Sequence, residues 1–150
     1  MSKIGIDQIV FLMQIFRYKK VEDRNPIDEI MNVLLPPLHQ RFMQLFAHND
    51  SDQSALIQKQ ILKIFHAYTQ VSFNSEFLLR SSSIVIFQLH LNFHVLPTQT
   101  MTTWLDTCCA MIERRLPERL DALEEEDRAE HPWWKCKKWA FHILIRTFER

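Results

Sequence analysis

The sequence predicts an all-α protein built from antiparallel pairs of amphipathic helices. Glycine, which sheet-rich and loop-rich enzymes need for turns and close backbone approaches, occurs once among the 150 residues. Apolar residues recur at helical spacing in four long segments, which begin at capping residues or at proline. Two helix pairs follow the same order along the chain: a kink-prone first helix, a polar connection and a strongly apolar second helix.

The first helix is expected to begin at Asn25-Pro26, because asparagine caps a helix and proline suits the first helical position. Pro36-Pro37 lies within the run, and we expect it to kink the helix or to divide it into two short ones. Steps of three and four residues place one apolar stripe on a single face: Ile27, Met31, Leu34, Leu38, Phe42 and Leu45.

The second helix follows a polar turn at residues 48–52, in which Ser51 or Asp52 is the expected cap. The third helix is expected to be capped by Thr98 or Thr100 and to stop or bend at Pro117. The apolar stripe of the second helix consists of Leu56, Ile57, Ile61, Ile64, Phe65 and Tyr68, and that of the third of Met101, Trp104, Leu105, Cys108 and Ile112.

An acidic segment at residues 121–130 precedes the last helix, which is expected to open at Pro132. One side of this helix is predicted to carry Trp133, Cys136, Ala140, Ile143 and Thr147, with Trp139, Leu144 and Phe148 beside them.

The two helix pairs lie farther apart in the sequence than a simple repeat allows. Ile27 and Met101 hold equivalent places about 74 residues apart, whereas HEAT or armadillo helix pairs recur every 40 to 47 residues or so. Residues 71–95 account for the excess, and residues 81–87 among them lack a helical period. Residues 71–88 are either a surface insertion or a retained intron, since their ends can be encoded by splice signals and their removal keeps the reading frame. Sequencing of the mature transcript distinguishes the two.

Composition excludes several classes of protein. The 18 basic and 18 acidic residues balance, so no global charge favours nucleic acid or an anionic membrane. The three cysteines, Cys108, Cys109 and Cys136, fit a reduced intracellular setting better than a disulfide framework. No apolar run reaches the roughly 20 residues that span a bilayer, and residues 4–16 read poorly as a signal peptide. We expect a soluble protein.

Catalytic and metal-binding patterns are weak. His90 and His94 have the spacing of two ligands on one helix face, but neither an HExxH motif nor a CxxC pair completes a zinc set. Cys136 and His142 are poorly placed to face each other. Cys108 and Cys109 fall on an apolar helical pattern, where cysteine behaves as a small hydrophobe. We therefore expect no enzyme, no cofactor and no metal.

A motif specific enough to indicate a protein family lies near the carboxyl end, where the string WWKCKKWA occupies residues 133–140. This string closely resembles a segment of importins seven and eight, a branch of the karyopherin-beta nuclear transport receptors. Other blocks that resemble the same family, in the same order, are residues 18–20, 25–26, 34–36, 56–65, 100–104, 127–128, 142–144 and 148–150.

The resemblance implies an α-solenoid of HEAT-like helix pairs that carries cargo proteins into the nucleus and is regulated by the GTPase Ran. It also implies nucleoporins and importin beta as partners, and shuttling between nucleus and cytoplasm. In that family the amino-terminal repeats bear most of the Ran contact. The chain then divides into residues 1–17 without a convincing match, a helix pair at 18–70, the segment 71–88, and a second helix pair at 89–150 with an acidic loop at 121–131.

The leading partner-binding residues are four consecutive acids, Glu124, Glu125, Glu126 and Asp127. Complementary charge would steer a basic cargo or a basic face of Ran toward them. The alternatives are a solvated loop, or pairing within the chain to Lys135 and Lys137.

A second hypothesis uses the helix around Lys135 and Trp139 as a nucleic-acid surface, in which aromatic stacking joins phosphate contacts. Against it, the tryptophans can pack between repeats while the lysines line the solvent face. A third reading is a truncated gene product without an independent role, because stable stacks usually need at least three repeats. Such a chain is expected to be poorly soluble or to oligomerise when it is made alone.

Overall fold

A computed structural model describes residues 5, 8, 25–48, 50–81 and 98–148. Every regular element within these residues is a helix, which confirms the predicted all-α class. The predictions for residues 1–17 (apart from residues 5 and 8), for His90 and His94, and for the end of the 71–88 segment lie outside the described residues. The elements are α2 (Asn25–His48), α3 (Asp52–Ser81), α4 (Thr98–Glu113), the 3-10 helix η3 (Glu118–Leu120), α5 (Glu125–Glu130) and α6 (Pro132–Phe148).

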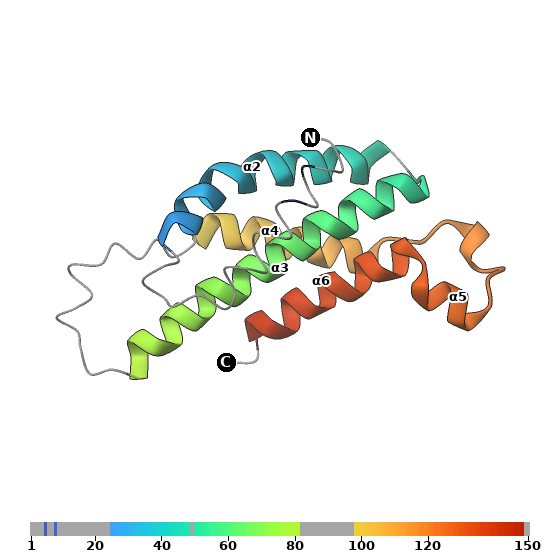
Figure 1. Ribbon diagram of the computed structural model, residues 1–150. Coiled ribbons are helices and arrows are strands. Elements are labelled where there is room, and N and C mark those ends of the chain that lie inside the picture. Colours follow the sequence, from blue (N-terminus) through green and yellow to red (C-terminus); the bar gives the residue numbers. More distant parts are fainter. Residues whose placement is uncertain (1–4, 6–7, 9–24, 49, 82–97, 149–150) are drawn as a thin grey trace.

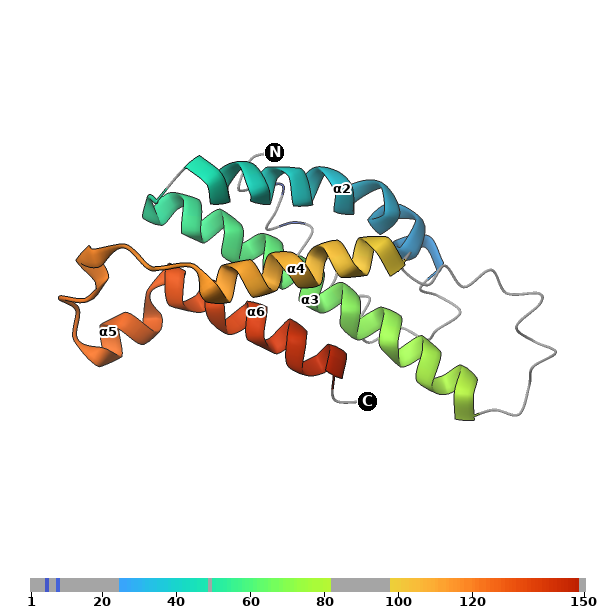
Figure 2. The ribbon, with the colours of Figure 1, turned by 180° about the vertical axis from the view of Figure 1, so that it is seen from behind.

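The four long helices form two antiparallel pairs that stack on each other (Figures 1 and 2). α2 pairs with α3 and α4 with α6, while α6 also packs against α3. The first helices of the two pairs meet as well, since His39 of α2 hydrogen-bonds Thr107 of α4. The first helix of one pair packs against the first helix of the other, and the second helix against the second. This is the arrangement expected of two HEAT-like repeats. We call these four helices the body.

The body encloses one apolar core. Phe65 of α3 stacks on Trp104 of α4 with ring centroids 4.4 Å apart, and both side chains are buried. The predicted stripes supply most of the core, but further buried residues lie beside them, because a core-facing helix buries a broader face than one row. These additional residues are Leu35, Ala55, Leu62 and Met111.

α2 runs as one helix through Pro36 and Pro37, so of the two expected outcomes, a kink or a division into two short helices, the division does not occur. The helix bends in its amino-terminal half instead (Figure 1). Proline removes backbone donors and favours a bend, while burial of Leu35 and Leu38 on either side keeps the chain helical.

Ser51 caps α3 as expected, because its hydroxyl accepts a hydrogen bond of 3.2 Å from the backbone N–H of Ser54. The backbone of α3 continues to Ser81, past the start of the 71–88 segment. α4 begins at Thr98 and ends at Glu113, before Pro117. Pro132 opens α6 as predicted, with Trp133, Cys136, Ala140 and Ile143 buried. None of the described helices is long and apolar enough to cross a bilayer.

Candidate partner-binding surface

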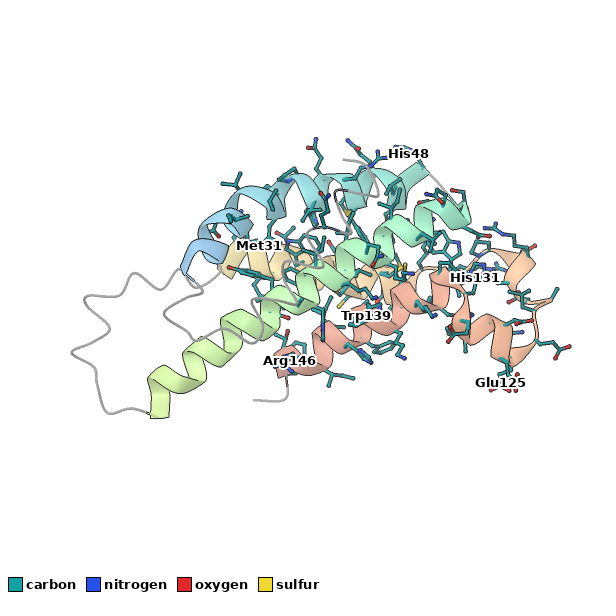
Figure 3. All side chains as sticks on the ribbon, viewed as in Figure 1. Met31, His48, Glu125, His131, Trp139 and Arg146 are labelled. Carbon is teal, nitrogen blue, oxygen red and sulfur yellow. The ribbon has the colours of Figure 1, made fainter. Side chains whose placement is uncertain are left out.

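The acidic candidates lie in the connection between α4 and α6, residues 114–131, which we call the connector. It contains η3 and α5, and α5 projects beyond one end of the body (Figure 1). Figure 3 places Glu125 on this projecting part and His131 where the connector rejoins the body. Three side chains of the connector contribute to the core: Leu120 is buried, and Leu116 and Leu123 pack against the core.

Arg114 fastens the start of the connector to the turn between α2 and α3. Its guanidinium donates to the backbone oxygen of Phe46 at 2.5 Å and pairs with the carboxylate of Asp50. It also lies between the Phe46 and Trp133 rings, 4.6 and 4.8 Å from their centroids. A cation held between two aromatic faces and a carbonyl is restricted to one orientation.

A second set of contacts joins the same turn to the middle and end of the connector. Arg119 donates to the backbone oxygen of Asp50 and to the carboxylate of Asp52, each at 2.6 Å. His131 lies 3.6 Å from that carboxylate. The hydrogen bond from Arg119 is the main reason that the pKa of Asp52 is lowered.

Within the connector, Arg128 closes the loop that precedes α5. Its guanidinium donates to the backbone oxygens of Asp121 and Leu123, each at 3.0 Å. Its backbone N–H bonds the carbonyl of Glu124, the residue before α5. These bonds satisfy carbonyls that the short elements leave unpaired, so the acidic residues are carried on an ordered turn.

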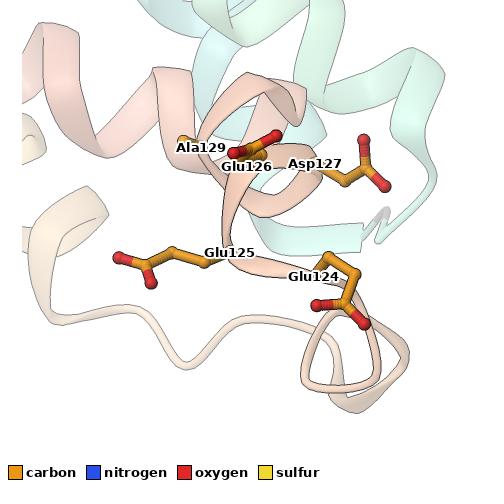
Figure 4. A pocket seen from close by; sticks show the side chains of 5 residues that line it. All are labelled: Glu124, Glu125, Glu126, Asp127 and Ala129. Atoms are coloured by element: carbon orange, nitrogen blue, oxygen red, sulfur yellow. The ribbon is translucent and has the colours of Figure 1, made fainter.

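The four acidic candidates are all exposed. They line a hollow of about 760 Å³ together with Ala129. Figure 4 shows that the carboxylates do not converge: Glu125 points away from Glu124 and Asp127. Divergent carboxylates suit an extended basic segment better than a single ion. No ion pair or side-chain hydrogen bond involving these four carboxylates occurs among the described residues.

The alternative in which Lys135 and Lys137 pair with the acidic candidates holds only for a neighbouring acid, Glu130. Lys135 binds Glu130 at 2.5 Å, and this hydrogen bond lowers the pKa of the Glu130 carboxyl. Lys137 donates to the backbone oxygen of Ile112 at 2.6 Å, and burial lowers the pKa of this lysine. Neither lysine forms an ion pair or a hydrogen bond with residues 124–127 in the described part of the chain.

The tryptophans of α6 lie mostly in the packing. Trp133 is buried, so its ring is not accessible to a base. Trp139 is half-buried, with Lys63 of α3 over its ring at 5.4 Å and His66 and His142 beside it. Trp134 is exposed by 39%. This arrangement corresponds to packing between helix pairs rather than to a row of stacking platforms.

The cysteines and histidines of the described residues do not assemble into a metal site. No cluster of three or more His, Cys, Asp or Glu side chains that could hold a metal is found in the described part of the chain. Cys136 donates to the backbone oxygen of Ala55 at 3.2 Å, and burial raises its pKa to about 12. Burial likewise raises the pKa of Cys108 to about 12, so neither thiol is an activated nucleophile.

Sequence analysis missed the arginines that position the acidic residues. Arg114 and Arg119 contact residues more than 60 positions earlier in the chain. The only local signal was the polar turn at residues 48–52.

Comparison with known proteins gives a consistent assignment. No family model matches the chain, and no solved structure does. Proteins named Importin-8 from Mus musculus and Homo sapiens are each 39% identical over 139 residues, which is 93% of this chain and 12% of each relative. Importin-8 of Danio rerio is 38% identical over the same share of the chain.

The chain thus spans about an eighth of the length of the relatives that it matches. The match covers nearly all of the chain, and the stacked helix pairs have the architecture that the resemblance implied. The chain belongs to the importin seven/eight branch of the karyopherin-beta family, and it matches a segment of these receptors.

Proposed function

We propose that this chain is part of a nuclear import receptor and that Glu124, Glu125, Glu126 and Asp127 bind a lysine- or arginine-rich segment of a cargo protein. The observation that carries this proposal is the placement of four exposed carboxylates, without an ion-pair partner among the described residues, on an ordered turn outside the body. Their combined field attracts a basic partner before contact, which raises the rate of association. The function is binding alone and requires no cofactor.

Direction of transport follows from linkage between two ligands. Cargo and GTP-bound Ran favour different curvatures of the solenoid, so each lowers the affinity for the other. The receptor then loads cargo in the cytoplasm and releases it in the nucleus, with nucleoporins and importin beta as further partners of the whole receptor. Family membership supports this proposal.

Fluorescence anisotropy with a labelled lysine-rich peptide tests the cargo site on the 150-residue chain. The variant E124Q/E125Q/E126Q/D127N is expected to bind about tenfold or more weakly at ~0.1 M salt, because four partly screened charge pairs are lost. The control D106N/E113Q removes two exposed acids of α4 and should bind like the parent chain. Unchanged affinity in the fourfold variant would refute the proposed site.

Ran regulation is tested separately, by titration of GTP-loaded Ran into the preformed peptide complex. Release of peptide by the GTP form, and not by the GDP form, is expected. Equal release by both forms, or none by either, contradicts regulation of this segment by Ran.

A further inference from the structure

The acidic turn of the proposed cargo site carries one basic residue, Arg128. It directly follows Asp127 and is the only basic residue of α5 (Glu125–Glu130). By its charge alone, an arginine at this place repels a lysine- or arginine-rich partner, and an exposed charge pair changes affinity about two- to fivefold. The contacts of this side chain indicate a second role, whose effect on binding is opposite to that of the charge.

α5 contributes little to its own order. It contains six residues, and none of them is buried. A helix of this length is not stable by itself in water, because few backbone hydrogen bonds offset the conformational entropy that is lost. The position of its carboxylates is therefore fixed by contacts to better-anchored parts of the connector.

The loop before α5 is such a part. Leu120 is buried in the core and Leu123 packs against it, and the backbone N–H of Leu123 donates to the carbonyl of Leu120 at 3.2 Å. The guanidinium of Arg128 donates to the backbone oxygens of Asp121 and Leu123, each at 3.0 Å. Arg128 thereby ties α5 to a loop whose leucines reach the core.

The backbone of Arg128 also bonds both ends of α5. Its N–H donates to the carbonyl of Glu124 at 2.9 Å, and its carbonyl accepts from the N–H of His131 at 3.1 Å. The side chain is half-buried and its Nε atom is buried, so the guanidinium lies against the backbone rather than extended into water. The two backbone bonds are available to any residue except proline, so a substitution of Arg128 tests the guanidinium alone.

We infer that Arg128 is a positioning residue of the proposed cargo site: its guanidinium holds Glu124, Glu125, Glu126 and Asp127 in place before a basic partner binds. The inference rests on the proposed function of these four acids. A segment that is already ordered loses less conformational entropy on binding, so its affinity is higher. Arg128 therefore favours a basic partner although it adds a positive charge beside the acids.

Fluorescence anisotropy with the lysine-rich peptide separates positioning from charge, because the two predict opposite signs. R128Q should bind the peptide at least about threefold more weakly than the parent chain. R128K should lie between them, because its ammonium can still donate to a carbonyl. Charge alone predicts that R128Q binds most tightly of the three. R115Q is the matched control: Arg115 is an 86% exposed arginine of the connector, and its loss should leave the affinity unchanged or raise it.

NMR relaxation tests positioning without the peptide. The {1H}–15N NOE of the amides of residues 124–128 should be close to that of α6 in the parent chain and in R115Q. It should fall in R128Q, because α5 loses its tie to the anchored loop. Parent-like NOE values in R128Q, or a peptide affinity of R128Q equal to or above that of the parent chain, overturns the inference. So does a lower urea midpoint of R128Q, which would mean that Arg128 supports the whole fold.

Failure of the cargo site itself gives a different result. If E124Q/E125Q/E126Q/D127N binds the peptide like the parent chain, the proposed function is wrong and the inference falls with it. If that variant loses binding while R128Q does not, the cargo site stands and the positioning role of Arg128 is wrong.

Discussion

The body and the connector of this chain are held together in opposite ways. In the body, apolar side chains from four helices meet in one core, as in the stacking of Phe65 on Trp104. In the connector, α5 buries no residue, and order comes from arginines that donate to backbone oxygens and carboxylates. Burial of apolar surface provides most of the folding free energy, whereas exposed polar contacts each add little.

Because of this difference, the residues that determine the stability of the fold are not the residues that carry the exposed negative charge. The body can lose no large core residue without a substantial loss of stability, because its interior is closely packed. The connector can change its exposed acids freely, because none of them is part of the core. A chain built in this way can vary the exposed residues of its connector while its core stays constant. Four predictions test the separation, from the largest expected effect to the smallest.

Truncation of the central tryptophan should have the largest effect. Trp104 is buried, stacks on Phe65 and contacts the His39 ring edge-on at 5.1 Å. W104A is expected to lower the free energy of unfolding by about 3–5 kcal/mol, through lost burial and the cavity that remains. Urea denaturation followed by circular dichroism measures it. F148A, which truncates an aromatic side chain that is 75% exposed, is the control and should cost less than about 1 kcal/mol.

Arg114 joins the two regions, so its loss should have an intermediate effect. R114M keeps an apolar stem but leaves the Phe46 carbonyl and the Asp50 carboxylate without their donor. We expect about 1–3 kcal/mol of destabilisation in the same assay. R115M is the control: Arg115 is 86% exposed, so its loss should cost less than about 0.5 kcal/mol. Equal effects of the two variants would mean that the connector is not fastened through Arg114.

His39 makes the body sensitive to pH. Thr107 donates its hydroxyl to the Thr103 carbonyl, so this oxygen accepts from Nε2–H of a neutral His39. Burial lowers the pKa of His39 below its usual 6.5. The unfolded chain therefore binds a proton first, and stability should fall as pH decreases through 6.5 toward the lower pKa of the folded state. The midpoint of urea denaturation should depend less on pH over this range in H39Q than in the parent chain. H48Q, at an exposed position, should keep the pH dependence of the parent chain.

Neutralisation of the acidic candidates should have the smallest effect on stability. E124Q/E125Q/E126Q/D127N changes only exposed side chains, so we expect a shift within about 0.5 kcal/mol in urea denaturation. The same variant is expected to lose peptide binding. A loss of stability comparable to that of R114M would show that these acids support the fold, and binding and stability would no longer be separable.

The two regions also differ in how far the sequence predicted them. Helical spacing identified Met31, Phe42, Ile61 and Trp133 as core residues, because burial in a helix follows its period. Spacing did not identify Leu35 or the continuity of α2 through its prolines, since both depend on packing against another helix.

In the connector, composition identified the acidic residues and nothing about what holds them. The contacts of Arg114 and Arg119 join segments far apart in sequence. The spacing of apolar residues cannot predict such a contact, because the contact depends on how the connector and the turn between α2 and α3 lie against each other in the folded chain. The acidic residues as a partner site remain a prediction.

Hydrogen exchange with and without the lysine-rich peptide tests the central claim most directly. Backbone amides of α3 and α6 should be strongly protected in both states, because their bonds open only with the core. Amides of the connector, residues 114–131, should exchange rapidly in the free chain and slow when peptide is added. Peptide-induced protection in the body with none in the connector would contradict the account.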